Sequence, residues 1–347
     1  MTTAAAAALD SSRERLVDRN PCLGPAELVA RLQPHARFGD VRFETYEPDP
    51  SHPSQQTALE AVSEFVTTID APGPRRPRFR RRRETEAGTD AGLYLDGGFG
   101  VGKTHLLASL WHAAPRPAAF SSFAELTALI GAFGMDTAVE VFGGHRLLCI
   151  DEFELDDVAH TLMTVTFLRR LLPGGTRVAC TSNTLPDRLG DGRFGADDFK
   201  REIAAIASHF EVITIDGPDY RHRSFAPEAA MTDAELDHRI ALAAGAVSVD
   251  DFDELLVHLR RVPPVQYGAF FDGLDTVCVR GMRAIENQGD ALLWVRFVDE
   301  AYEAGVGLCA SGTGVEEVFA ASYRQGGYRK KYGRAESRLN AMLAEST

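Results

Sequence analysis

Short apolar runs alternate with helical patterns through the first two thirds of the chain. Five runs have the length and composition of buried strands: GLYLD (92–96), PAAFSS (117–122), RLLCIDEF (146–153), RVACTSNT (177–184) and FEVITID (210–216). Between them, apolar residues recur at helical spacing in HLLASLWHAA (105–114), FAELTALIGAFG (123–134), VAHTLMTVTFLRRLLPGG (158–175) and FKREIAAIASHF (199–210). Strands that alternate with helices predict an α/β fold with a parallel sheet flanked by helices.

Helical patterns also lie on both sides of this region. Upstream, GPAELVARLQ (24–33) and SQQTALEAVSEFVTTI (54–69) predict an N-terminal helical segment. After residue 230 the chain predicts helices in TDAELDHRIALAAG (232–245), VDDFDELLVHLRRV (249–262) and ALLWVRFVDEAYEAG (291–305), and strands in TVCVRG (276–281) and VGLCASG (306–312). This C-terminal α/β extension either forms a second lobe or continues the same sheet.

These patterns divide the chain into five segments. They are a frayed or helical tail (1–23), the helical segment (24–71), an arginine-rich linker or loop (72–90), the alternating core (91–228) and the C-terminal α/β segment (229–347). Because 347 residues exceed one ordinary core, we expect one large domain and a smaller one.

Composition and cysteine usage predict a globular protein of the cytoplasm. Hydrophobic residues make up 44% of the chain and charged residues 25%. No apolar run reaches the roughly 18 residues that span a bilayer, and the first residues lack the basic start of a secretion signal. The cysteines are scattered, without a CxxC pair: Cys22, Cys149, Cys180, Cys278 and Cys309. Small buried thiols in a reducing compartment explain them better than disulfides or a zinc site.

The net charge of −13 argues against nucleic acid as a partner, because phosphates would be repelled. One stretch departs from this average, since residues 75–83 contain seven arginines. It is either a solvated connector or a docking strip for an acidic partner, an anionic lipid or a nucleic acid.

The stretch GGFGVGKT (97–104) predicts a phosphate-binding loop. It matches G-x-x-x-x-G-K-[ST], with a strand before it and a helix after it. Its residues are the predicted nucleotide contacts: Gly97, Gly98, Phe99, Gly100, Val101, Gly102, Lys103, Thr104 and His105. The glycines let backbone N–H groups surround phosphate oxygens, and the helix start adds partial positive charge. Lys103 is expected to reach the β- and γ-phosphates, and the Thr104 hydroxyl to bind Mg²⁺.

Three polar residues at strand ends complete a predicted hydrolytic site. Asp151 and Glu152 follow a buried strand, where open α/β sheets bind ligands. Asp151 is expected to help hold Mg²⁺ and Glu152 to polarise the attacking water. Asn183 ends the next strand, at the sensor position of AAA+ ATPases, where its amide can orient that water. The adjacent acids indicate a P-loop NTPase of the AAA+, additional-strand class.

The sequence resembles the ZapE cell-division ATPases, bacterial relatives of a mitochondrial lactation-elevated ATPase family. The resemblance runs over about residues 36–342 and depends on GGFGVGKTHLL, LLCIDEFELDD, TSNTLPDRLGDGRF, HFEVITIDGPDYRHR and RAESRL, in that order. It implies an AAA+ fold, ATP hydrolysis, action as an oligomer and a role around the FtsZ division ring, whereas the mitochondrial relatives act in protein quality control. It also implies that the SQQ at 54–56 lies near the adenine, with Gln55 as our candidate contact.

The sequence also departs from the family pattern. The His-rich strand and helix that commonly follow the P-loop helix are replaced by AAFSSFAELTALIGAFG, and the arginine pair usual after the TSN strand is out of register. Arg193 and Arg201 flank that place, and each is either an arginine finger acting on a neighbouring subunit or a surface ion-pair partner. Further cations that could sense nucleotide are Arg221, Arg223 and Arg338.

Three functions remain open from the sequence. The first is a Mg²⁺-dependent, homo-oligomeric ATPase that reshapes a protein partner at the division site, with peripheral membrane contact left open. The second is a helicase-loader or replication-initiator ATPase, for which the basic stretch 324–334 would be the candidate DNA contact. The third is a nucleotide-switched scaffold with little turnover. A GTPase is disfavoured, because no NKxD motif follows Asp151.

Overall fold

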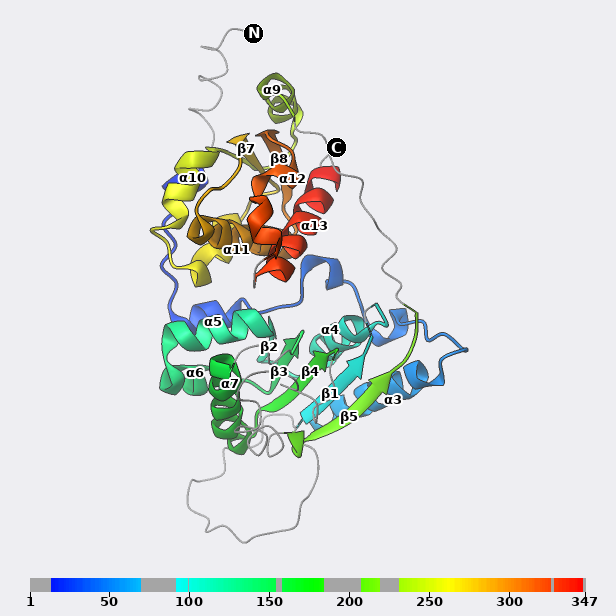
Figure 1. The fold of residues 1–347 in the computed structure, drawn as a ribbon. Helices are drawn as coiled ribbons and strands as arrows, with labels where there is room; N and C mark the ends of the chain where they lie inside the picture. The colour runs from blue at the N-terminus through cyan, green and yellow to red at the C-terminus, as the bar shows by residue number, and fades with distance from the viewer. Residues whose placement is uncertain are drawn as a thin grey trace. The chain divides into compact units, whose positions relative to one another are not determined.

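The computed structural model describes residues 14–69, 92–98, 100–153, 158–183, 207–218, 231–325 and 328–345 (Figure 1). The chain forms two compact units. One is Gly24–His222, called the P-loop unit here, and the other combines Met1–Leu23 with Arg223–Thr347 and is called the C-terminal unit.

The P-loop unit is built on a five-stranded parallel sheet. Its strands are β1 (Gly92–Gly97), β2 (Ala118–Ser122), β3 (Leu147–Asp151), β4 (Arg177–Ser182) and β5 (Phe210–Ile215), in the order β2-β3-β4-β1-β5. The predicted parallel α/β sheet is therefore confirmed. β4 lies between β1 and β3 and is the additional strand that the acidic pair indicated. Because the three strands are parallel, their carboxyl ends lie at the same edge of the sheet.

Helices cover both faces of this sheet (Figure 1). They are α2 (Pro25–Ala30), α3 (Pro53–Thr68), α4 (Lys103–Ala113), α5 (Phe123–Phe133), α6 (Met135–Phe142) and α7 (Val158–Leu171), with short 3-10 turns at Ala36–Phe38, Phe43–Thr45 and Leu172–Gly174. On one face, apolar residues of α3 and α4 pack with odd-numbered strand residues such as Leu93 and Leu95. On the other face, the rings of Tyr94, Phe153 and Phe123 are in edge contact.

One helix of this unit was missed from the sequence, and one predicted helix cannot be compared. Helix α6 was not predicted, because its eight residues between Gly134 and Gly143 are too few to show a clear period. The predicted helix at 199–210 lies largely outside the described residues.

The C-terminal unit has its own three-stranded parallel sheet, so the C-terminal segment does not extend the first sheet. Its strands are β6 (Val247–Asp251), β7 (Thr276–Met282) and β8 (Gly307–Gly312). Its helices are α9 (Asp233–Leu242), α10 (Phe252–Leu259), α11 (Gln288–Ala304), α12 (Val315–Val318) and α13 (Arg329–Glu345), with 3-10 helices at Leu16–Asp18, Pro264–Phe271 and Ala321–Gln325. Trp294 and Phe297 of α11 stack at a centroid distance of 5.0 Å in its core.

The predicted helix at 249–262 is wrong at its start. Val249, Asp250 and Asp251 belong to β6, and the helix begins at Phe252. The Asp251 side chain caps it by accepting hydrogen bonds from the N–H groups of Asp253 and Glu254, at 2.9 and 3.1 Å. A capping aspartate followed by an apolar helix therefore concealed the short strand.

Residues 14–23 form a segment that we call the N-terminal strap, and it differs from the tail expected from the sequence. Leu16 is fully buried in the core of the C-terminal unit. The N–H groups of Leu16 and Val17 donate to the two carboxylate oxygens of Asp250, at 3.0 and 3.1 Å. Glu14 bridges to Ser248 along the free edge of β6. The C-terminal unit is thus assembled from both ends of the chain.

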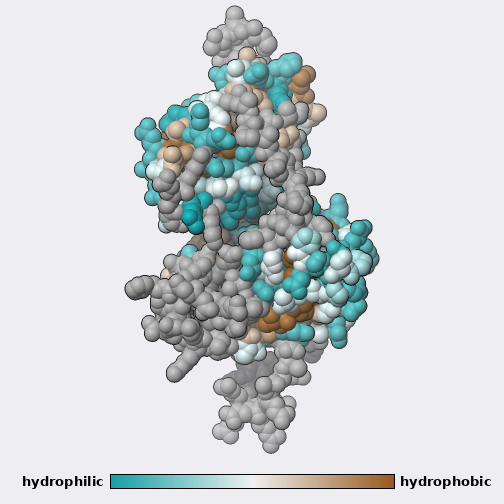
Figure 2. Space-filling view, turned by 45° about the vertical axis from the view of Figure 1, so that its right-hand side comes forward, coloured by the Kyte–Doolittle hydropathy of each residue, from teal (hydrophilic) through white to brown (hydrophobic). Residues whose placement is uncertain are grey.

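In the part of the surface that Figure 2 colours, hydrophilic residues predominate and hydrophobic residues form small patches. Among the described residues, the exposed large apolar side chains are Leu162, Val212, Leu242, Val257 and Tyr328. No helix in the described part of the chain is long and apolar enough to cross a membrane.

Candidate nucleotide-binding site

The P-loop joins the end of β1 to the start of α4, as the sequence predicts. Gly102 precedes α4 with φ 91°, in the left-handed region that favours glycine. A Cβ at Gly102 would lie 2.6 Å from the ring of Tyr46, and one at Gly97 would lie 2.3 Å from the carbonyl oxygen of Ile215. Larger residues would clash at both positions, so the loop's course depends on these glycines.

Lys103 lies inside the loop and is almost completely buried. Its Nζ atom donates to the carbonyl oxygens of Gly97 and Gly98, at 2.7 and 2.5 Å, and to Oδ1 of Asn183, at 2.9 Å. The predicted lysine and the predicted sensor amide thus meet at the carboxyl ends of the neighbouring parallel strands β1 and β4.

Thr104 and Asp151 form the second pair of the site. The Thr104 hydroxyl lies 3.1 and 3.2 Å from the two carboxylate oxygens of Asp151 at the end of β3. The pKa of Asp151 is raised to about 6, chiefly because burial removes the carboxylate from water. The charge of Glu152 also raises this pKa, whereas hydrogen bonds from Thr181 and Thr104 lower it. A hydroxyl beside a carboxylate is an oxygen donor set that suits Mg²⁺.

Glu152 has an unusual backbone. Among the described residues it is the one non-glycine residue with positive φ, at 54°. Its N–H donates to the hydroxyl of Thr181 at 3.0 Å, and the next N–H, of Phe153, donates to the carbonyl of Thr181 at 2.7 Å. The Thr181 hydroxyl itself donates to Asp151. Thr181 was not predicted as a site residue, although a polar residue in the buried run VACTS was a signal for it.

Tyr46 is a second residue that the sequence did not reveal. Its hydroxyl donates to the carbonyl of Val101 at 3.3 Å, and its ring contacts that of His105 edge-on at 5.4 Å. The His105 ring also lies 3.1 Å from the Thr45 hydroxyl, and burial lowers its pKa. Thr45 and Tyr46, which lie between α2 and α3, thus contact the P-loop and the first turn of α4.

Gln55 lies beside the P-loop, and both the oxygen and the nitrogen of its side-chain amide are hydrogen-bonded. It accepts from the Asp49 N–H at 2.9 Å and donates to the Asp216 carbonyl, after β5, at 3.1 Å. A Cβ on the following residue, Gly217, would come within 3.5 Å of Val101 of the P-loop. Gln55 therefore joins the segments before and after the loop, and its closeness to adenine stays a prediction.

Several predicted site residues lie outside the described residues. These are Phe99, Arg193, Arg201, Arg221 and Arg223, so the arginine finger stays a prediction. Arg338 lies on α13 of the C-terminal unit, where it pairs with Asp299 at 2.7 Å and Glu303 at 3.1 Å.

The sequence model of the AFG1-like ATPases matches residues 24–241 and 228–347, which together cover almost all of the described chain. The chain belongs to the AFG1-like ATPase family. The family is described as one of ATPases, and the P-loop and acidic pair described above are features that ATP binding and hydrolysis need.

The curated relatives of this chain include the cell division protein ZapE of Escherichia coli K12. It is 28% identical over 229 residues, which cover 58% of this chain and 61% of the relative. An uncharacterized protein of Schizosaccharomyces pombe is 23% identical and covers 49% of this chain and 47% of that protein. The chain thus spans less than two thirds of the length of the curated relatives that it matches.

Solved structures with some likeness include DnaI and the AMPPCP-bound DnaA of Aquifex aeolicus. DnaI aligns at a TM-score of 0.40 with 18% identity, over 53% of this chain and 93% of that chain. DnaA aligns at 0.38 with 15% identity, over 51% of this chain and 50% of that chain.

The residues at this site fit a nucleotide with its magnesium ion. The glycine cradle leaves no room for a Cβ at Gly97 or Gly102, and Lys103 supplies a buried cation for phosphate oxygens. Within the described part of the chain, no group of three or more His, Cys, Asp or Glu side chains could hold a metal ion. Two protein oxygens, from Thr104 and Asp151, match the usual way in which Mg²⁺ binds through few carboxylates together with phosphates and water.

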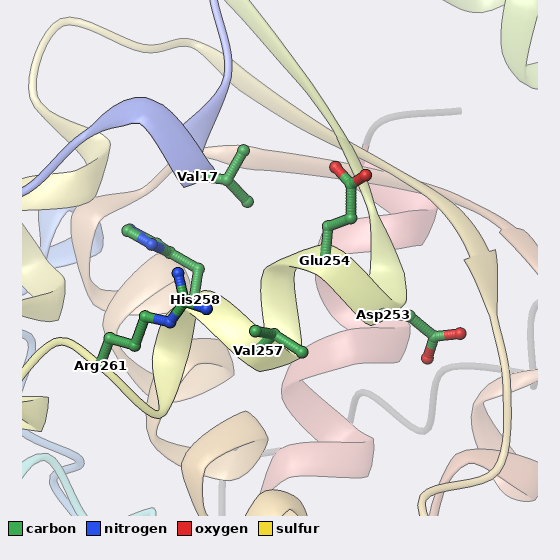
Figure 3. Close-up of a pocket in the computed structure, with 6 residues that line it drawn as sticks. All are labelled: Val17, Asp253, Glu254, Val257, His258 and Arg261. Atoms are coloured by element: carbon green, nitrogen blue, oxygen red, sulfur yellow. The ribbon is translucent and has the colours of Figure 1, made fainter.

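A separate hollow of about 380 Å³ lies on the C-terminal unit, between the strap and α10 (Figure 3). It is lined by Val17, Asp253, Glu254, Val257, His258 and Arg261. Both acids already pair with arginines, Asp253 with Arg283 and Glu254 with Arg15. Apart from these paired acids, the hollow is lined by two valines, by His258 and by the cation of Arg261. These side chains do not form a set suited to catalysis.

Proposed function

We propose that the protein hydrolyses ATP with Mg²⁺ as cofactor. The observation that carries this proposal is the convergence of Thr104, Asp151, Lys103 and Asn183 at the ends of β1, β3 and β4. Lys103 is hydrogen-bonded to Asn183, and Thr104 to Asp151. A cation and a set of oxygen donors therefore lie at the same end of the P-loop. This is the arrangement that phosphoryl transfer to water requires.

Each residue has a defined part in this chemistry. Lys103 neutralises charge on the terminal phosphate, and Thr104 and Asp151 would hold Mg²⁺. The bound ion would supply charge neutralisation of the phosphate oxygens. Glu152 accepts a proton from the water that attacks the γ-phosphorus. The bond between the γ-phosphorus and the oxygen that bridges it to the β-phosphate breaks, and ADP leaves. Asn183 orients that water from the other side.

The proposal extends to an oligomer that acts on a protein partner in cell division. Its support is the name of the Escherichia coli relatives, cell division protein ZapE, over the matched 58% of this chain. In such an assembly, Arg193 or Arg201 would reach the γ-phosphate held by a neighbouring subunit. The arginine stretch at 75–83 would provide contact with the partner or with anionic lipid.

Phosphate release by the purified full chain tests the hydrolysis. Lys103→Ala should abolish nucleotide binding, whereas Glu152→Gln should bind ATP and release little phosphate. Glu64→Gln, an exposed acid of α3 in the same unit, is the matched control and should keep full turnover. Substantial turnover by Glu152→Gln would exclude Glu152 as the base, and a wild-type protein that binds ATP without releasing phosphate would point to a nucleotide-switched scaffold.

Light scattering after size-exclusion chromatography tests the assembly, with and without a non-hydrolysable ATP analogue. We expect a larger species with the analogue. In a mixture of an arginine variant with Lys103→Ala protein, the arginine variant keeps an intact P-loop and the Lys103→Ala subunit keeps both arginines. Turnover should therefore return for Arg193→Ala or for Arg201→Ala, whichever removes the arginine that acts in trans. A monomer under every condition would contradict the oligomeric part of the proposal.

A further inference from the structure

Glu152 has an unusual backbone conformation, and Thr181 of the neighbouring strand β4 binds the backbone on both sides of it. The positive φ of 54° is intrinsically unfavourable for a glutamate, so the surrounding structure must fix it. The N–H groups on both sides of the turn, those of Glu152 and Phe153, donate to the hydroxyl and the carbonyl of Thr181. The direction of the Glu152 carboxylate therefore depends on Thr181.

The Thr181 hydroxyl has a defined polarity. A backbone N–H can only donate, so the hydroxyl accepts from the Glu152 N–H and its own proton is left for Oδ1 of Asp151. One buried hydroxyl thus connects the predicted base with the predicted Mg²⁺ ligand. Without it, the Glu152 N–H and the Asp151 oxygen would each lose a partner in a site with little access to water.

Thr181 also lies close to the phosphate end of the site. It is two residues before Asn183, whose Oδ1 accepts from Lys103. The end of β4 therefore binds the acidic pair through Thr181 and the P-loop lysine through Asn183.

We propose that Thr181 is a positioning residue for ATP hydrolysis, which aims the Glu152 carboxylate by holding its backbone in the left-handed conformation. This inference rests on the proposed ATPase function. Thr181 touches neither nucleotide nor water in this scheme, and acts through Glu152 and Asp151. Its loss should therefore lower turnover more than nucleotide affinity.

Three variants separate this role from general packing. Thr181→Val removes the hydroxyl at nearly constant shape, and Thr181→Ser keeps the hydroxyl and removes a methyl group. Thr164→Val is the matched control, because Thr164 is fully buried in the same unit and its hydroxyl has no partner among the described residues. Thr181→Ala serves as a second hydroxyl-free variant should the valine protein fail to fold.

The first measurement needs no nucleotide. Hydrogen exchange of the Glu152 amide should be about tenfold faster in Thr181→Val than in the wild type, with the amides of α4 unchanged. Thr181→Ser and Thr164→Val should exchange like the wild type. An unchanged Glu152 amide, or faster exchange across the whole unit, would overturn the positioning role.

The second measurement is steady-state phosphate release. We expect kcat of Thr181→Val to fall roughly 10- to 100-fold, with the KM for ATP within about twofold of the wild type and kcat restored by Thr181→Ser. Equal kcat in the valine and wild-type proteins would overturn the inference. A wild-type protein without turnover would overturn the ATPase proposal instead, and the exchange of the Glu152 amide would still decide whether Thr181 fixes that backbone.

Discussion

The Thr104 hydroxyl lies 3.1 Å from Oδ1 of Asp151, although 47 residues separate the two in sequence. Thr104 belongs to the first turn of α4, which follows β1, and Asp151 to the end of β3. Since β4 lies between β1 and β3 in the sheet, the contact joins α4 to a strand that is not a neighbour of β1. The contact joins the glycine-rich loop and the acidic pair, which in the sequence are two separate motifs.

Removal of the Thr104 hydroxyl should weaken nucleotide binding only when Mg²⁺ is present. Thr104→Val keeps the shape and loses one ligand oxygen, so we expect the Mg²⁺-dependent gain in ATP affinity to fall roughly 10- to 100-fold, on the order of 1–3 kcal/mol. Titration of a fluorescent ATP analogue in Mg²⁺ and in EDTA measures the difference. Thr57→Val on α3 is the control, since its hydroxyl only donates within its own helix. Equal loss in both buffers would contradict a role in metal binding.

Two glycines of the P-loop unit should respond in opposite ways to alanine. Gly102→Ala forces a side chain into a left-handed position and to within 2.6 Å of the Tyr46 ring, so the unit should lose about 1–2 kcal/mol or more. Gly131 lies inside α5 with nothing within 4 Å of an added Cβ, so Gly131→Ala should gain about 0.5–1 kcal/mol. Calorimetric unfolding measures both, and a stable Gly102→Ala protein with full ATP affinity would contradict the tight packing of Tyr46.

The sequence predicted the parts of the site that motifs tie to strand ends. Lys103 and Thr104 were found from the glycine-rich loop pattern at 97–104. Asp151 and Asn183 were found because a polar residue that follows a buried run marks the carboxyl edge of a parallel sheet. Thr181 escaped notice, since its importance comes from hydrogen bonds to residues about 30 positions away.

The missed elements have local explanations. Strand β6 runs directly into the cap of α10, so that its residues extend a helical pattern. Helix α13 has correctly spaced buried residues at Tyr332, Ala335 and Leu339, but Gly333 and a run of cations weaken the pattern. The N-terminal strap is too short for a clear apolar period, and its place is set by distant contacts such as the hydrogen bonds to Asp250 and the bridge to Ser248.

Asp250 should be essential to the attachment of the strap. Its two oxygens accept separate N–H groups, and an asparagine can accept only one of them, so Asp250→Asn should destabilise the C-terminal unit by about 1–3 kcal/mol. Asp253→Asn is the control, because Asp253 is exposed and pairs only with a partly exposed arginine. Denaturant unfolding followed by Trp294 fluorescence, in a Trp111→Phe background, reports this unit alone. Equal midpoints for the two variants would show that the strap does not depend on Asp250.

The P-loop unit should lose stability in mild acid through His145. Burial lowers the pKa of this imidazole, and bonds to the carbonyls of Val141 and Phe142 only partly oppose that. The unfolded chain therefore binds a proton more readily, so the contribution of His145 is complete above about pH 6.5 and declines as the pH falls below it.

The measurement is the change in unfolding temperature between about pH 7.5 and about pH 5.5, which brackets the ordinary histidine pKa. His145→Asn keeps an N–H donor near the Nδ1 atom, which lies 3.1 Å from the Val141 carbonyl, but it cannot be protonated in this range. Its unfolding temperature should fall less with pH than that of the wild type, whereas His209→Asn, at an exposed position, should follow the wild type. If His145→Asn and the wild type show the same pH dependence, the buried imidazole does not account for the acid sensitivity of this unit.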